Sequence, residues 1–306
     1  MLNIQGVNVI KLGNVEIIDT FAELFPMWGS RILITAANEK WAKTAAQVAT
    51  GFASSIIMSP AEAGIERFLS PSETPDGRPG VIIHIYHKTR IMLRAQILTR
   101  LGQCVLTCPT TATFDGIPEA KRKLKIGNSL RMFGDGFESN EELYGRNMWR
   151  IPVMEGDYLI EDLMGTKKAA AGGNLLILAK DWKSGLKASE DAVEAIKQTD
   201  AKAVLPFPGG ICRSGSKVGS LKYKLAASTN HFYCPSIRDK VPESKIPEGV
   251  KSVYELVING MTLDDVSKAM KAALHAAAKV DGIVQITAAN YGGKLGKMKV
   301  YLKDLL

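Results

Sequence analysis

The residue most suggestive of chemistry is Glu255, an acid inside the apolar segment KSVYELVIN at 251–259. Alternate side chains of a strand point to opposite faces, so Glu255 shares a face with Val253 and Val257. A carboxylate in that setting is ion-paired, exposed at a sheet edge, or held in an apolar pocket that raises its pKa. The last arrangement gives an acid that donates a proton near neutral pH, whereas the first two are structural roles.

Glycine-rich polar segments adjoin the predicted strands. They are PAEAGIE (60–66) with TPDGRPG (74–80), PFPGGICRSGSKVGS (206–220), AASTN (226–230) and NYGGKLGK (290–297). Glycine lets a backbone approach a ligand closely and turn its N–H groups toward an anion, and Lys217 and Lys294 are available as countercharges. Long connections with turn glycines explain the same composition. No segment has the spacing of a phosphate-binding loop, so nucleotide-driven chemistry is not expected.

Composition narrows the class of protein. A chain of 306 residues with 46% hydrophobic residues favours two ordinary domains over one large domain. No apolar run is long enough to span a membrane, and the charged start does not resemble a signal peptide, so we expect a cytoplasmic protein that does not bind membranes.

Metal and disulfide frameworks are not indicated. The four cysteines form no CxxC pair. His84 and His87 are three residues apart in a predicted strand and therefore point to opposite faces. We expect reduced cysteines and no metal site.

The net charge of +8 and pI near 9.2 favour acidic partners. The densest basic stretch, 121–125, lacks the interleaved aromatic residues of a base-stacking surface. A solvated turn explains this stretch, and we expect no nucleic-acid binding.

The elements that position these residues follow from periodicity. Strands are predicted at 31–37, 54–60, 81–87, 103–108, 174–180, 203–207, 251–259 and 283–289, with helices near 41–52, over 90–101, over 186–198, and after the capping box of Thr262 and Asp265. Each half of the chain therefore has the order βαββαβ. The segments MWRIPV and DYLIEDL flank a turn at Glu155 and Gly156, which predicts a hairpin extension.

This order predicts an α+β fold of two tandem ferredoxin-like (split βαβ) lobes with hairpin extensions. The N-terminal lobe is expected at 1–148 and the C-terminal lobe at 149–306. Such lobes occur in enzymes, metabolite sensors and nucleic-acid binders, so the fold alone does not assign a function.

The glycine-rich segments, together with IIDTFAE (17–23), LGQCVLTCPTTATF, PVMEGDYLIED and VYELVING, make the chain resemble the formylmethanofuran:tetrahydromethanopterin formyltransferase family. The basic composition resembles the form that is a subunit of a formyltransferase/hydrolase complex in methylotrophic bacteria. The resemblance implies reversible formyl transfer between a methanofuran-type carrier and tetrahydromethanopterin, as cosubstrates and without a prosthetic group. It also implies a homotetramer with the active site at a subunit interface.

The resemblance also implies the site residues. Glu255 falls on the catalytic glutamate, and the substrate-binding positions are Glu62, Asp76, Arg78, Gly209, Gly210, Ser216, Lys217, Asn230, Tyr291 and Lys294. Arg213 and Lys217 are candidates to bind the acidic tails of the carriers. Three alternatives stay open: a hydrolase-coupled member, an inactive complex scaffold, and a ferredoxin-like RNA- or metabolite-binding module.

Overall fold

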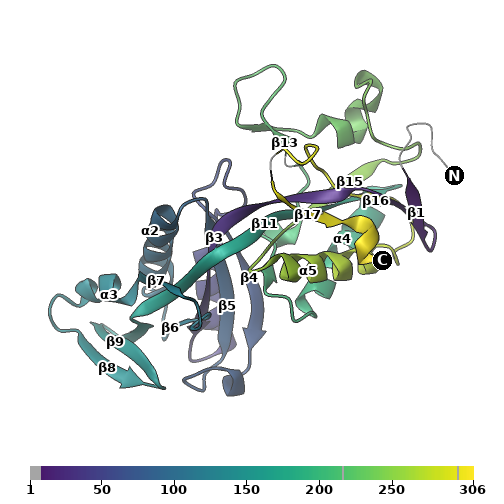
Figure 1. Ribbon diagram of the computed structural model, residues 1–306. Helices are drawn as coiled ribbons and strands as arrows, with labels where there is room; N and C mark the ends of the chain where they lie inside the picture. Colours follow the sequence, from purple (N-terminus) through teal and green to yellow (C-terminus); the bar gives the residue numbers. More distant parts are fainter. Residues whose placement is uncertain (1–7, 216, 295) are drawn as a thin grey trace. The chain divides into compact units, whose positions relative to one another are not determined.

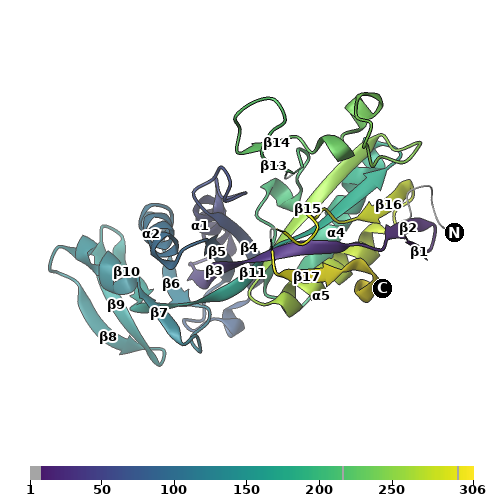
Figure 2. The same cartoon turned by 45° about the horizontal axis from the view of Figure 1, so that its top comes forward.

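The computed structural model describes residues 8–215, 217–294 and 296–306, and it is a mixed α+β protein with mostly antiparallel sheets (Figures 1 and 2). Its α-helices are α1 Glu39–Thr50, α2 Arg90–Arg100, α3 Gly127–Leu130, α4 Trp182–Lys197 and α5 Leu263–Ala277. Its strands are β1 Val9–Leu12, β2 Val15–Ile18, β3 Phe21–Thr35, β4 Glu62–Leu69, β5 Gly80–His87, β6 Ala112–Asp115, β7 Arg122–Lys125, β8 Ser139–Leu143, β9 Arg146–Val153, β10 Gly156–Glu161, β11 Leu163–Ala179, β12 Ala203–Val204, β13 Lys217–Val218, β14 Ala227–Ser228, β15 Ser252–Gly260, β16 Ile283–Thr287 and β17 Met298–Tyr301.

The chain forms two compact units. Unit 1 contains residues 1–26 and 169–306, and unit 2 contains residues 27–168. The long strands β3 and β11 each run from one unit into the other. The chain passes from one compact unit to the other inside these two strands. The boundary between tandem lobes at 148/149 stays a prediction.

Unit 2 is built on an antiparallel sheet in the order β4-β5-β3-β6. Helices α1 and α2 bury their alanine, leucine and isoleucine side chains on one face, against apolar residues of β3 and β5. The β9–β10 hairpin extends this sheet from β6. Its turn lies at Met154 and Glu155, one residue before the predicted turn at Glu155 and Gly156, because Gly156 already pairs with Val153 as the first residue of β10.

Unit 1 repeats the same order of strands, β12-β15-β11-β16, again antiparallel. Helices α4 and α5 cover one face with a core that includes Leu256 and Ile258 of β15. The opposite face has no α-helix and is called the helix-free face below. It is covered by the connection from β12 to β15 (205–251), which contributes Tyr233, Ile246 and Val250. Both views place this connection on the side of the sheet away from α4 and α5 (Figures 1 and 2).

The predicted helices are confirmed, and α5 begins at the predicted capping box: the Asp265 amide donates to Thr262 Oγ1 at 3.1 Å. Two predicted strands are wrong. Residues 54–60 form a turn, because the Ser59 amide and hydroxyl both donate to the Ser55 carbonyl, which competes with strand pairing. The second strand of this unit is β4 instead.

The predicted strand at 103–108 is wrong for a different reason. Leu101 and Val105 continue the apolar stripe that Leu93 and Ile97 begin on α2, so the chain keeps a helical period. It passes into a π-helical turn at Leu101–Val105, where the Leu106 amide donates to the Leu101 carbonyl at 2.8 Å. The fourth strand is β6.

Across the described ranges, none of the helices has the length and apolar content needed to cross a membrane.

Candidate active site

Glu255 lies in β15 on the helix-free face of the unit 1 sheet, and only 1% of it is exposed. In the strand register it is opposite Leu176 of β11, which is itself opposite Thr287 of β16. The three side chains therefore form a row across the sheet. Tyr233, from the 205–251 connection, hydrogen-bonds Thr287 at the end of this row, and burial raises the pKa of the Tyr233 hydroxyl.

The glycine-rich loop is fixed directly to Glu255. The Cys212 amide donates to the Glu255 carbonyl at 2.8 Å, and the Glu255 amide donates to the Cys212 carbonyl at 2.9 Å. Cys212 and Glu255 are directly opposite one another in this bridge, so their side chains lie on the same face of the pair. Burial raises the pKa of the Cys212 thiol, a hydrogen bond with Ser214 lowers it, and Glu255 raises it. The backbone pairing of Cys212 thus holds the 206–220 segment beside Glu255.

The next part of the loop reaches the AASTN segment. A Cβ atom built on Gly215 would lie 2.6 Å from Asn230 Cβ, so this approach requires glycine, and its φ of +73° also favours glycine. Strand β13 pairs with β14, and Lys217 Nζ lies 3.1 Å from His231 Nδ1. The structure therefore brings Lys217 and Asn230 to the same pair of loops.

Tyr291 joins the NYGGKLGK loop to this pair. Its hydroxyl accepts a hydrogen bond from the Val218 amide at 2.9 Å. Tyr291 is 39% exposed and Lys294 is also exposed, so both side chains are accessible to a ligand. Glu255 is linked to the 206–220 loop, and that loop is linked to Asn230 and Tyr291.

The remaining predicted residues of the 206–220 loop differ in their surroundings. Gly209 has a φ of +62° and open space around its Cα, whereas a Cβ atom on Gly210 would lie 2.9 Å from Val193 of α4. Packing on α4 therefore accounts for Gly210. Ser216 lies outside the described residues.

Three predicted substrate-binding residues belong to unit 2. Asp76 and Arg78 hold a turn together: Asp76 Oδ2 accepts from Thr35 Oγ1 at 2.6 Å and from Arg78 Nε at 2.8 Å. The Arg78 guanidinium also donates to the Thr110 carbonyl at 2.6 Å. Glu62 is 5% exposed, and its carboxylate accepts from the Ile56 amide at 2.9 Å.

Sequence reasoning missed two residues of the unit 1 site. His231 contacts Lys217, but an isolated histidine in a polar loop carries no signal of its own. Glu23 accepts hydrogen bonds from the amides of the NYGGKLGK loop. An acid inside the apolar run FAELF carries the same signal as Glu255 and could have been found in the same way.

The arrangement in unit 1 combines a buried carboxyl group, a glycine-rich loop, and accessible amide, phenol and ammonium groups. Such a site suits proton transfer to a bound substrate that the loops position. In the part of the chain that the structure describes, no three His, Cys, Asp or Glu side chains are grouped to hold a metal ion.

The comparison with protein families identifies a match along almost the whole chain. The model of formylmethanofuran-tetrahydromethanopterin formyltransferase matches residues 10–153, and the model of the proximal lobe of that enzyme matches residues 156–305. Among the similar curated proteins is the formyltransferase of that name from Methanocaldococcus jannaschii, which is 53% identical over 300 residues, covering 97% of this chain and 99% of the relative. The Archaeoglobus fulgidus protein of the same name is 52% identical over 297 residues, covering 97% and 100%.

Two solved structures are similar throughout. The formyltransferase from Methanosarcina barkeri aligns with a TM-score of 0.94 at 50% identity, covering 97% of this chain and 100% of that chain. The formyltransferase/hydrolase complex from Methylorubrum extorquens, solved with methylofuran, contains a chain that aligns with a TM-score of 0.93 at 46% identity, covering 98% and 99%.

Proposed function

This chain belongs to the formylmethanofuran–tetrahydromethanopterin formyltransferase family, and we propose that it transfers a formyl group between a methanofuran-type carrier and tetrahydromethanopterin at Glu255. The match to both lobes supports the reaction. The observation that supports the site is the position of Glu255: a buried acid bonded through its backbone to the glycine-rich loop. Both carriers are cosubstrates, and the proposed reaction requires no prosthetic group.

The chemistry requires one N–C bond to form and another to break. The attacking amine adds to the formyl carbon, the formyl oxygen becomes negative in the tetrahedral intermediate, and the leaving amine takes a proton. In the proposed mechanism Glu255 enters the reaction as the neutral acid and donates a hydrogen bond to the formyl oxygen. Its proton then passes to the departing amine, and the proton that the attacking amine loses returns to Glu255, with no covalent enzyme intermediate.

The loops around Glu255 hold the two carriers. Asn230 and Tyr291 supply hydrogen-bonding groups, while Lys217, Lys294 and Arg213 supply positive charge for carboxylates or phosphates. Gly209, Gly210 and Ser216 of the 206–220 loop are also proposed to bind substrate, and Glu62, Asp76 and Arg78 are proposed substrate-binding residues of unit 2 by itself. Binding both carriers together removes much of the entropic barrier to their reaction.

The test is an ultraviolet difference spectrum recorded on mixing the purified chain with the formylated furan carrier and tetrahydromethanopterin. We expect a spectral change from formation of the formylated pterin, at a rate proportional to enzyme concentration. Hydrolysis of the furan carrier without formylation of the pterin would instead support the hydrolase-coupled alternative. The absence of both reactions would support an inactive scaffold, and the comparisons favour neither alternative.

We also propose that each unit is a ferredoxin-like split βαβ lobe. The support is the repeated sheet order β4-β5-β3-β6 and β12-β15-β11-β16, in which the second, third, first and fourth strands of a βαββαβ unit follow one another. Helices α1 and α2, or α4 and α5, cover one face in each case.

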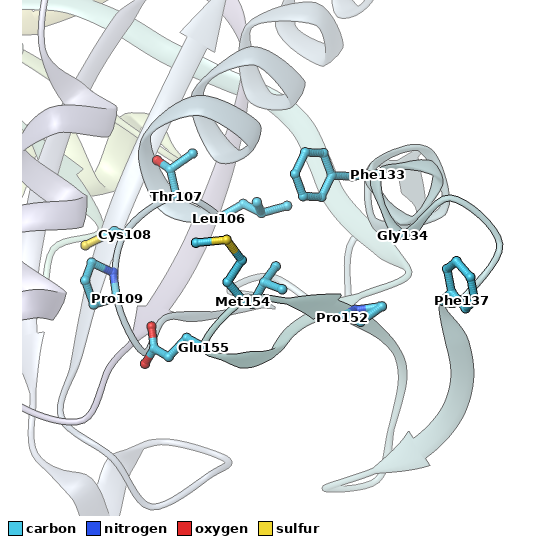
Figure 3. A pocket seen from close by; sticks show the side chains of 11 residues that line it. Leu106, Thr107, Cys108, Pro109, Phe133, Gly134, Phe137, Pro152, Met154 and Glu155 are labelled. Atoms are coloured by element: carbon cyan, nitrogen blue, oxygen red, sulfur yellow. The ribbon is translucent and has the colours of Figure 1, made fainter.

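We propose further that the chain assembles as a homotetramer, and that it is part of a larger formyltransferase/hydrolase complex as its Methylorubrum relative is. The support for self-assembly is an exposed apolar patch around the β9–β10 hairpin of unit 2. A hollow of about 800 Å³ is lined by Met154, Phe133 and Phe137 among others. Figure 3 shows these side chains. Met154 is fully exposed, and Phe137 is 83% exposed, which favours a surface covered by a second copy.

Light scattering tests the assembly. The parent chain should be larger than a monomer at micromolar concentration, and Met154→Asp with Phe137→Asp should shift it toward smaller species. Met58→Asp is the matched control, because Met58 is a 72% exposed methionine of the same unit that does not line the hollow. A monomeric parent with full activity would contradict the proposal.

A cytoplasmic location is the remaining proposal. Its support is that Cys104, Cys108, Cys212 and Cys234 are all free, as expected in a reducing compartment.

A further inference from the structure

Glu23 is a buried acid of β3 whose carboxylate is turned toward the NYGGKLGK loop, although the two are about 270 residues apart in sequence. Oε2 accepts a hydrogen bond from the Tyr291 amide at 2.7 Å and one from the Gly293 amide at 3.1 Å. Oε1 accepts from the Gly296 amide at 2.7 Å. Both carboxylate oxygens therefore hold the backbone of a single loop.

The loop is shaped to surround this carboxylate. Gly292 and Gly293 have φ values of +67° and +80°, a left-handed conformation that favours glycine. The Gly293 amide donates to Glu23, while the Gly292 amide donates to Asn290 Oδ1 at 3.1 Å. A Cβ atom on Gly296 would lie 1.9 Å from the Leu24 carbonyl oxygen, so only glycine lets the loop lie against β3 at that point. Gly293 and Gly296 turn their amides toward an anion, as glycines of this loop were expected to do, and that anion is Glu23 of the same chain.

The inward amides leave the side chains directed outward. Tyr291 and Lys294 are exposed, while the backbone between them is fixed by Glu23. The Tyr291 hydroxyl also accepts a hydrogen bond from the Val218 amide, so Tyr291 connects the 290–297 loop to the hairpin of β13 and β14. That hairpin carries Lys217.

We propose that Glu23 is a positioning residue of the transfer site: its carboxylate fixes the 290–297 loop and so sets where Tyr291 and Lys294 meet a carrier. That Tyr291 and Lys294 bind a carrier rests on the proposed function. Glu23 itself takes no part in the chemistry. Its loss should therefore weaken carrier binding more than it slows the chemical step.

The variant Glu23→Gln keeps the size of the side chain but replaces one accepting oxygen by a donor group that opposes a backbone N–H. We expect amide hydrogen exchange in 290–297 to become roughly tenfold faster or more, with little change in segments of α4 and α5. We expect KM for at least one carrier to rise roughly tenfold, with kcat within about threefold of the parent. Glu23→Asp retains the charge, so both the exchange rate and KM should change less than in Glu23→Gln. If Glu23→Gln does not fold, Glu23→Asp is measured in its place.

Glu66→Gln is the matched control, because Glu66 is equally buried, at 7% against 6% exposed, and lies in the other unit. It should leave exchange in 290–297 unchanged. Parent-like exchange in 290–297 for both Glu23 variants would overturn the proposal, and this readout needs no substrate. If the parent transfers no formyl group, the proposed function fails while the exchange result still tests the role of Glu23.

Discussion

Glu66 in unit 2 and Glu255 in unit 1 are both buried glutamates, and each lies on the helix-free face of a sheet with the same strand order. Glu66 is the extra residue of a β-bulge in β4, between Ile65 and Arg67. The bulge turns its carboxylate toward Arg31 and His84, which are directly opposite one another on β3 and β5.

The partners of Glu66 account for its protonation state. Arg31 donates to both carboxylate oxygens, at 2.6 and 2.7 Å, and His84 Nε2 lies 2.6 Å from Oε2. Burial alone would raise the pKa of Glu66, but the hydrogen bonds from Arg31 and His84 outweigh it and lower the pKa to about 2. Glu66 is a permanent carboxylate that cross-links three strands and cannot supply a proton near neutral pH.

Glu255 is buried in a different environment. Its carboxyl group lies near the Cys212 thiol, and its backbone is bonded to a glycine-rich loop that leads to Lys217 and Tyr291. Burial of a glutamate therefore does not identify a catalytic acid. The two differ in what surrounds the carboxyl group: strand side chains in unit 2, and the ligand-accessible loops of unit 1.

Removal of the Glu66 carboxylate should have the largest effect on stability. Glu66→Ala leaves the largely buried Arg31 guanidinium without its carboxylate partner, so the free energy of unfolding should fall by about 3–5 kcal/mol. Urea denaturation measures this change. The control is Glu73→Ala, which removes an exposed carboxylate that pairs with Arg67 at 2.8 Å and should change stability little. Equal losses of unfolding free energy in the two variants would show that the buried contacts of Glu66 stabilise unit 2 no more than an exposed ion pair does.

Lowering the pH should gradually remove the contribution of Glu66 to the free energy of unfolding. Because its pKa falls from 4.5 to about 2 on folding, the stabilisation is complete above the unfolded pKa and is lost as the pH falls toward the folded pKa. The difference in unfolding free energy between the parent and Glu66→Gln should therefore be about 2 kcal/mol smaller at pH 3 than at pH 6. A difference that is independent of pH would mean that Glu66 has an ordinary pKa in the folded protein.

A smaller effect is expected from the basic residues of the 206–220 loop. The double substitution Arg213→Ala, Lys217→Ala should raise KM roughly tenfold and change kcat less, with a milder loss at high salt because ions screen exposed charges. Lys183→Ala, Lys187→Ala on the exposed surface of α4 removes the same charge and is the control. Unchanged KM for both carriers in the first variant would exclude these residues from carrier binding.

Local patterns were sufficient to predict much of this structure. The alternation around Glu255 placed it on a face with Val253, and the capping box at Thr262 located the start of α5. The strand at 103–108 was predicted wrongly because a short apolar run fits a strand as well as a helix, and only the continuing stripe with Leu93 distinguishes them.

The contacts that distinguish the two glutamates could not be predicted in this way. Arg31 is 35 residues from Glu66, and the Tyr291 amide is 268 residues from Glu23. His84 was considered only as a possible metal ligand, because its register opposite Arg31 depends on how β3 and β5 pair. A single sequence shows that an acid is buried, whereas its partners depend on the pairing of distant strands.

The central claim is that Glu255 carries the proton in formyl transfer, and kcat of Glu255→Gln and Glu255→Ala tests it most directly. Glutamine can still donate a hydrogen bond to the formyl oxygen but cannot pass on a proton. If proton transfer is required, both variants should lose roughly 10²-fold or more in kcat, with folding and carrier binding nearly intact. If only a donor is required, Glu255→Gln should lose much less than Glu255→Ala. Turnover close to the parent rate in both variants, with carrier binding unchanged, would contradict the claim and make Glu255 a structural glutamate like Glu66.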